Sequence, residues 1–135
     1  MRRTGFIQRK TPLVTRTAIV RTKGPRPKRK PERKGIEAFH FDRLRHEVGC
    51  LITGQTGAHV TIHHVTAPIE GGRRDRTDRR VVPLLREYHQ HDYGMTSVER
   101  LGHGGFFREH GIDLWAEAER LWAETEALWN ERQAA

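Results

Sequence analysis

The chain has 135 residues, a hydrophobic content of 35% and a formal net charge of +8. This length accommodates one domain with a modest core and a tail. The single cysteine excludes an intramolecular disulfide framework and indicates a reducing compartment, and no apolar run approaches the length of a membrane span. We therefore expect a soluble, cytoplasmic protein without a membrane partner.

Residues 1–35 carry the excess of positive charge. They hold 13 of the 25 Lys and Arg residues and one acid, a net charge of +12, whereas the rest of the chain has a net charge of −4. The run GPRPKRKP at 24–31 continues neither a helix nor a strand, so we predict a disordered basic arm. It lacks the amphipathic pattern of a transit peptide, and its charge exceeds what solubility requires. Binding of a polyanion is therefore favoured, with candidate contacts at Lys28, Arg29 and Lys30.

After the arm, apolar residues recur at helical spacing and predict a helix over 36–47, ended by Gly49. His40 and His46 lie on this helix without a partner at metal-ligand spacing. We therefore expect them to be ordinary surface or half-buried side chains.

Two short strands are predicted next. Residues 58–65 are rich in β-branched side chains and contain two adjacent histidines, His63 and His64. A second strand follows Asp78 and runs into a helix at Pro83, whose fixed φ suits a first helical turn.

The loop 66–77 between these strands is rich in arginine, although the chain beyond the arm is slightly acidic. Because Arg presents a fork of donors to phosphate oxygens, we favour a grip on a nucleic-acid backbone over a merely solvated loop. The arginines concerned are Arg73, Arg74 and Arg76.

Glycines and caps divide the remaining chain. Thr96 and Glu99 have the spacing of a capping box, which gives Glu99 a structural role. A short helix is predicted from Phe106 to Gly111, and Asp113 is a good N-cap for a last helix over 114–131. This helix has two adjacent apolar heptad positions, which predict packing against the body or, alternatively, a dimer or partner contact. The residues are Leu114, Leu121, Leu128, Trp115, Trp122 and Trp129.

The histidines suit phosphodiester hydrolysis, which needs a nucleophilic water, a base and a cation. Strand neighbours point to opposite faces, so one of His63 and His64 can bind a metal while the other faces the attacking water. His89, on the helix after the second strand, can complete the metal site, and Asp78 can orient the base or add a ligand.

The pattern resembles the HNH (His-Me finger) endonucleases, and within them the prophage-type group that includes the phage RecA-dependent nuclease Ref. The likeness spans roughly residues 46–115. It is carried by His63-His64, Gly71-Gly72, Asp78, Val82-Pro83-Leu84, Tyr88-His89, Leu101-Gly102, Phe106 and Gly111-Ile112-Asp113. It implies an α+β fold with a small ββα-metal core flanked by helices.

The resemblance also implies roles for individual residues. His64 would be the general base and Asp78 its polar partner. His63 and His89 would hold a divalent ion, Mg²⁺ or Mn²⁺. Glu99 stands where relatives often have a histidine, and it either coordinates the metal or only caps a helix.

Relatives commonly bind a structural zinc, but this chain departs from that pattern. Cys50 stands at the first ligand position, whereas Thr53, Leu85 and Tyr88 occupy the other three. One thiolate cannot form a tetrahedral zinc site, so no structural zinc is expected. We expect Cys50 to be a buried small hydrophobe and the pair Leu85 and Tyr88 to fill the space as an apolar plug.

These expectations combine into a basic arm over 1–35, a nuclease domain over 36–113 and a C-terminal helix over 114–135. The expected function is metal-dependent hydrolysis of DNA, in a phage or prophage context linked to recombination. The resemblance suggests a recombinase filament as a further partner, and the chain would be a monomer or a homodimer through its last helix. The lost zinc ligands and Glu99 favour one alternative, a catalytically inactive DNA-binding or assembly protein. An RNA partner is a third option.

Overall fold

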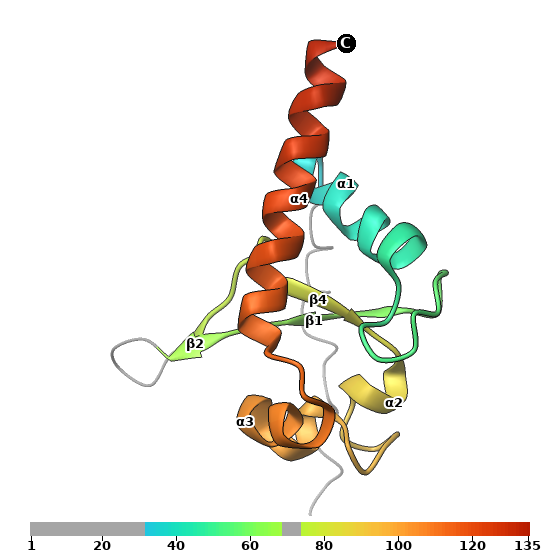
Figure 1. Cartoon of the computed structure of the whole chain (residues 1–135), viewed down its shortest axis with the longest axis vertical. Helices are drawn as coiled ribbons and strands as arrows, with labels where there is room; N and C mark the ends of the chain where they lie inside the picture. Colours follow the sequence, from blue (N-terminus) through green and yellow to red (C-terminus); the bar gives the residue numbers. More distant parts are fainter. Residues whose placement is uncertain (1–31, 69–73) are drawn as a thin grey trace, which may run out of the picture. The chain divides into compact units, whose positions relative to one another are not determined.

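Two short antiparallel strands lie at the centre of the α+β fold in the computed structural model, which describes residues 32–68 and 74–135 (Figure 1). β1 (Thr61–His64) pairs with β4 (Val81–Leu84), and His63 lies opposite Val82. A second pair joins β2 (Ala67–Pro68) to β3 (Arg74–Asp75), so the predicted loop 66–77 begins and ends in a short ladder.

Helical segments precede and follow these strands. They are α1 (Gly35–Arg43), the π-helical turn η1 (Leu44–Val48), α2 (Arg86–His89), α3 (Val98–His110) and α4 (Leu114–Ala134). Together α1 and η1 confirm the helix predicted over 36–47. Gly49 follows with φ 76°, and a β-carbon at this position would lie 2.6 Å from the carbonyl oxygen of Gln55, so the turn requires glycine. Among the described residues, 32–68 and 74–135, no helix is long and apolar enough to cross a membrane.

The compact unit begins at Glu32 and includes α4. Residues 32–35, which we had assigned to the basic arm, therefore belong to the folded unit. The rest of the predicted arm, with Lys28, Arg29 and Lys30, lies outside the described residues, as does Arg73.

Pro83 does not begin a helix, and that prediction was wrong. It lies in β4 opposite Ile62. The ladder hydrogen bond from Val65 N to Arg80 O places this pair at a non-hydrogen-bonded position, where the missing N–H of proline costs nothing. The Pro83 carbonyl accepts a hydrogen bond from Leu51 N at 3.1 Å, so β4 is also held on its outer side.

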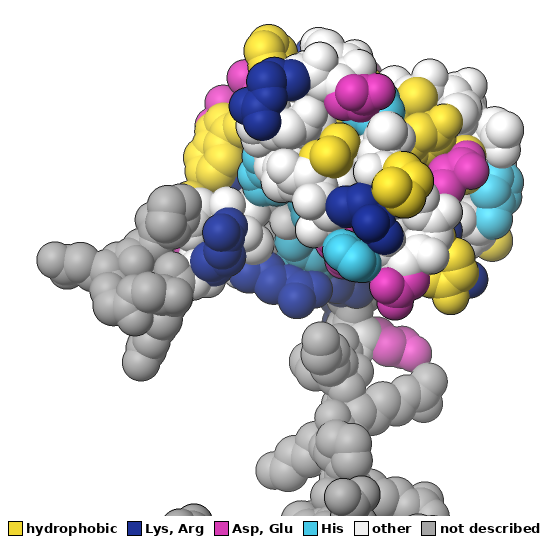
Figure 2. Space-filling model, turned by 90° about the horizontal axis from the view of Figure 1, so that it is seen from below, with side chains coloured by type: hydrophobic (Ala, Val, Ile, Leu, Met, Phe, Trp, Pro, Cys, Tyr) yellow, Lys and Arg dark blue, Asp and Glu magenta, His cyan; other side chains and the backbone are white. Residues whose placement is uncertain are grey.

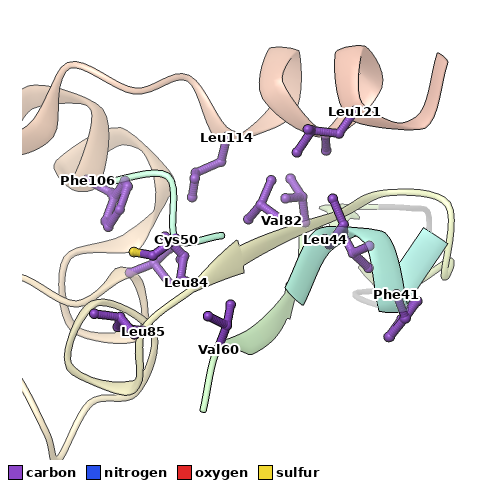
Figure 3. Packing of buried hydrophobic residues seen from close by; sticks show 14 residues of the cluster. Phe41, Leu44, Cys50, Val60, Val82, Leu84, Leu85, Phe106, Leu114 and Leu121 are labelled. Atoms are coloured by element: carbon purple, nitrogen blue, oxygen red, sulfur yellow. The ribbon is translucent and has the colours of Figure 1, made fainter. Parts of the chain in front are cut away.

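The core is built around β4, which is buried along its whole length. In Figure 3, Val82 points toward Leu114 and Leu121 of α4. Cys50 is 2% exposed and packs in the same cluster as Leu85, with the half-buried Tyr88 against it. The apolar environment predicted for Cys50 is therefore confirmed.

The start of α3 differs from the predicted capping box. Its N-cap is Ser97, which makes no side-chain cap hydrogen bond. The Glu99 carboxylate instead accepts a hydrogen bond from His91 N at 3.0 Å. The helix then continues to His110 with a break at Gly102, whose φ of 69° and ψ of 173° are not helical. Glu99 is thus free of the capping role that we had assigned to it.

Asp113 caps α4 as predicted, accepting hydrogen bonds from Trp115 N and Ala116 N at 3.0 and 3.2 Å. Leu114 and Leu121 of the apolar stripe pack on the body, where they are 2% and 0% exposed, whereas Trp115 is 38% exposed. Toward the C-terminus the stripe emerges, and Leu128 is 36% exposed. Packing against the body, one of the two alternatives for this helix, therefore accounts for the leucine positions at the N-terminal end of α4.

A buried polar network joins α1 to α4, which lie side by side (Figure 1). His40 is fully buried rather than at the surface or half-buried as we expected, because α4 covers it. The Thr125 hydroxyl donates to Leu121 O at 2.9 Å, so it accepts from His40 Nδ1 at 2.7 Å and from Arg43 at 3.1 Å. Arg43 also pairs with Glu124 at 2.7 Å.

Replacing Thr125 with valine should lower the free energy of unfolding by about 1–3 kcal/mol, because two buried donors lose their acceptor. Urea unfolding followed by tryptophan fluorescence measures this loss. The matched control is Thr125→Ser, which keeps the hydroxyl and should lose clearly less. Equal stability of the two variants would show that the network contributes little.

Candidate functional site

Three histidines from different elements meet beside β1. His63 lies on β1, His89 ends α2 and His103 lies in α3, just after the break at Gly102. The Nε2 atoms of His63 and His103 are 3.2 Å apart, and the ring centroids of His63 and His89 are 5.0 Å apart. The fold therefore brings together two of the predicted ligands and adds His103, which the sequence analysis missed.

His89 is oriented by a threonine on β1. The Thr61 hydroxyl donates to Leu84 O at 2.7 Å, so it accepts the Nδ1 proton of His89 at 2.8 Å. This bond fixes the tautomer and leaves the Nε2 lone pair of His89 available. That atom lies 3.8 Å from Glu99 Oε1, so the predicted carboxylate borders the same site.

These imidazoles are neutral at neutral pH. Burial, together with the charges that His89 and His103 would carry, lowers the pKa of His63 to about 3. Burial is also the main cause that lowers the pKa of both His89 and His103. Neutral imidazole is the form that binds metal ions.

His64 points away from this cluster and contacts a different set of residues, as strand alternation predicts. Its Nε2 lies 2.8 Å from Asp78 Oδ1. Asp78 accepts a further hydrogen bond from Arg33 Nε at 2.8 Å, and the Arg33 guanidinium stacks 3.9 Å above the ring of Phe41. The Arg33 hydrogen bond is the main cause that holds the pKa of Asp78 below its usual value, with the bond from His64 adding to it.

The tautomer of His64 follows from these contacts. An ionised Asp78 accepts the Nε2 proton, so Nδ1 carries the lone pair. Burial lowers the pKa of His64 despite the opposing effect of Asp78, so the ring is neutral and able to take a proton. The Nδ1 atom faces Arg76, whose guanidinium nitrogen is 3.2 Å away. Asp78 thus lies where it can orient His64, whereas no sequence motif had marked Arg33.

One pair of nitrogen atoms in the cluster has the spacing that a bound divalent ion requires. Two nitrogens bound to one ion at about 2.1 Å lie roughly 3.0–3.4 Å apart, which is the spacing of His63 and His103. Across residues 32–68 and 74–135, no group of three His, Cys, Asp or Glu side chains already surrounds one point. His89 and Glu99 border the His63–His103 pair, so they are the nearest donors to complete a coordination shell.

A hollow of about 440 Å³ opens over this cluster, and Arg74 lies on its wall with His63, Glu99 and His103. Arg74 is exposed and donates a hydrogen bond to Thr66 at 3.2 Å. Figure 2 shows histidine and basic side chains gathered next to one another on this unit. Side chains that we predict to hold a metal and an arginine that we predict to contact phosphate thus line one cavity.

No protein-family model matches this chain, and neither curated proteins nor solved structures offer a significant match.

Proposed function

We propose that the protein is a metal-dependent endonuclease of the HNH type that hydrolyses phosphodiester bonds in DNA. The order β1, β4, α2 would be its ββα unit. The observation that carries the proposal is the hydrogen-bonded pair of His64 and Asp78, on the strand whose other face presents His63 to His89 and His103. A phage or prophage context and a recombinase partner remain proposals from the resemblance.

The chain's own residues would act as follows. Asp78 holds the Nε2 proton of His64, and Nδ1 takes a proton from the attacking water. A bound divalent ion, Mg²⁺ or Mn²⁺ by the resemblance, would stabilise negative charge on the phosphate and leaving-group oxygens. His63 and His89, with His103 and Glu99 beside them, are the residues that would hold it.

Substrate binding would also change the contact between Arg76 and His64. In the free protein its guanidinium donates toward the lone pair of His64 Nδ1, which occupies the atom that must accept the proton. A phosphate is a stronger partner for guanidinium than a neutral imidazole. Substrate would therefore draw Arg76 from His64 and free the base.

The proposal is tested with the untagged full-length chain and supercoiled plasmid. We expect nicked and linear products with Mg²⁺, Mn²⁺ or another divalent ion, and none in EDTA. No cleavage with any divalent ion, together with salt-sensitive DNA binding, would contradict the enzyme. That result would favour the second candidate, an inactive DNA-binding protein. The observation that favours this candidate is that no three possible ligands surround one point within the described part of the chain.

Replacing Arg74 with alanine should weaken DNA binding and lower the slope of log affinity against log salt concentration by about 1, because one phosphate contact is lost. Fluorescence anisotropy at several salt concentrations measures both. The matched control is Arg132→Ala, since Arg132 of α4 stacks on Phe39 of α1 and does not line the cavity of Arg74. Equal slopes for the two variants would exclude Arg74 as a phosphate contact.

A further inference from the structure

His103 approaches His63 more closely than a chance surface neighbour would. Their Nε2 atoms are 3.2 Å apart, both rings are half-buried, and the ring planes are nearly perpendicular at 87°. The helix break at Gly102 immediately precedes His103, and the positive φ there is one that residues with a β-carbon rarely adopt. A backbone feature that requires glycine therefore sets the position of this histidine.

Two arrangements produce such a spacing. One imidazole can donate its Nε2 proton to the other, or both lone pairs can point at one ion. Nitrogens about 2.1 Å from a shared ion lie ~3.0 Å apart at octahedral and ~3.4 Å apart at tetrahedral angles, and the observed distance falls between them. The distance between the two Nε2 atoms is therefore the one that two ligands of a shared ion require.

We propose that His103 is a metal ligand, and that with His63 it makes the site selective for a transition ion of the Zn²⁺ class over Mg²⁺. The metal site itself rests on the proposed function. His103 is not among the residues on which the HNH resemblance rests.

The type of donor sets the preference. Imidazole nitrogen suits Zn²⁺, Co²⁺ and Ni²⁺, whereas Mg²⁺ prefers oxygen ligands and retains most of its waters. The cluster offers three imidazoles and one carboxylate, that of Glu99. The Thr61 hydroxyl accepts the Nδ1 proton of His89. Histidines that bind metal ions usually donate their other ring N–H to such a partner, which orients the ring.

The test is calorimetric titration of the untagged, EDTA-treated and desalted full-length chain with ZnCl₂, CoCl₂ and MgCl₂ in separate runs. We expect one Zn²⁺ or Co²⁺ site that is at least tenfold tighter than any Mg²⁺ site. His103→Ala should weaken Zn²⁺ affinity by at least about 10- to 100-fold, because losing even an outer partner of a ligand costs that much. Visible absorption of bound Co²⁺ should change in the same variant.

The matched control is His46→Ala, because His46 is an exposed histidine that pairs with Asp42 on the surface. It should bind Zn²⁺ as the parent does. His103→Gln keeps a polar side chain that can still hydrogen bond to His63. If the alanine variant does not fold, Zn²⁺ affinity is measured with this variant instead. Thermal unfolding of each metal-free variant checks the fold.

Unchanged Zn²⁺ affinity in a folded His103 variant would overturn the ligand assignment, and equal affinity of the parent for Zn²⁺ and Mg²⁺ would overturn the selectivity. These outcomes are separable from the fate of the nuclease proposal. Tight Zn²⁺ binding that depends on His103, without DNA cleavage in any ion, would contradict the nuclease alone. Cleavage by a His103 variant with parental metal affinity would contradict the role of His103 alone.

Discussion

Replacing His64 with alanine should lower the rate of plasmid nicking by about 10²- to 10⁴-fold, which is the usual contribution of a general base. His64 has a neutral ring, a tautomer fixed by Asp78 and a lone pair on the remaining nitrogen. Removing it leaves the three-histidine cluster and the exposed arginines in place. Binding of DNA and of metal should therefore remain at the parental level.

Time courses of nicking in the preferred ion, with anisotropy measurements of DNA binding, separate the two effects. The control is again His46→Ala, which removes an exposed histidine that pairs with Asp42 and should cleave like the parent. If the His64 variant nicks at the parental rate, another group is the base. If it loses DNA binding as well, His64 contributes to substrate binding instead.

Acidification from pH 7 to pH 4 should cost the fold about 3 kcal/mol through His40 alone. Burial, assisted by the charge of Arg43, lowers the pKa of His40 from 6.5 to about 4. Its Nε2 atom is buried without a hydrogen-bond partner among residues 32–68 and 74–135, so a proton there would find no acceptor in them. Because the unfolded chain binds this proton at higher pH, stability is complete above pH 6.5 and is lost progressively toward pH 4.

Free energies of unfolding in urea, measured at intervals between pH 4 and pH 7.5, report this loss. The matched variant is His40→Phe, which keeps a ring against Trp122 but does not titrate. It sacrifices the hydrogen bond to Thr125 at every pH, so the informative quantity is the pH slope. The parent should show a steeper slope between pH 4 and pH 6.5 than the variant. Parallel curves would mean that His40 titrates normally in the folded protein.

Local signals in the sequence predicted the elements well. The β-branched run before His63 predicted the strand that is observed, and Asp113 predicted the N-cap of the last helix. The alternation of side chains along a strand predicted that His63 and His64 point to opposite sides. Each of these outcomes depends on neighbouring residues and is therefore visible without tertiary contacts. The apolar environment of Cys50 was also predictable, since its would-be partner positions hold Leu85 and Tyr88.

The predictions failed at residues whose conformation or burial is determined by tertiary contacts. Pro83 has a φ that suits a helix start and a strand edge equally, and pairing with β1 selected the strand. His103 follows Glu99 by four residues, a spacing that could have indicated a shared helix face, but glycines on both sides made the segment look like a linker. His40 was misplaced because its burial depends on Thr125, 85 residues further along the chain.

Arg33 limits how far the N-terminus can be truncated without disturbing the proposed catalytic pair. It lies before α1, in the segment that charge and composition assign to the basic arm, yet its guanidinium is fixed on Asp78, 45 residues away. A truncation beginning at Gly35 would keep every helix and strand described above and remove that guanidinium. The shortened protein would fold with a carboxylate less firmly held behind His64. If the proposed mechanism holds, a truncation that removes Arg33 together with the polybasic segment would impair catalysis as well as DNA binding.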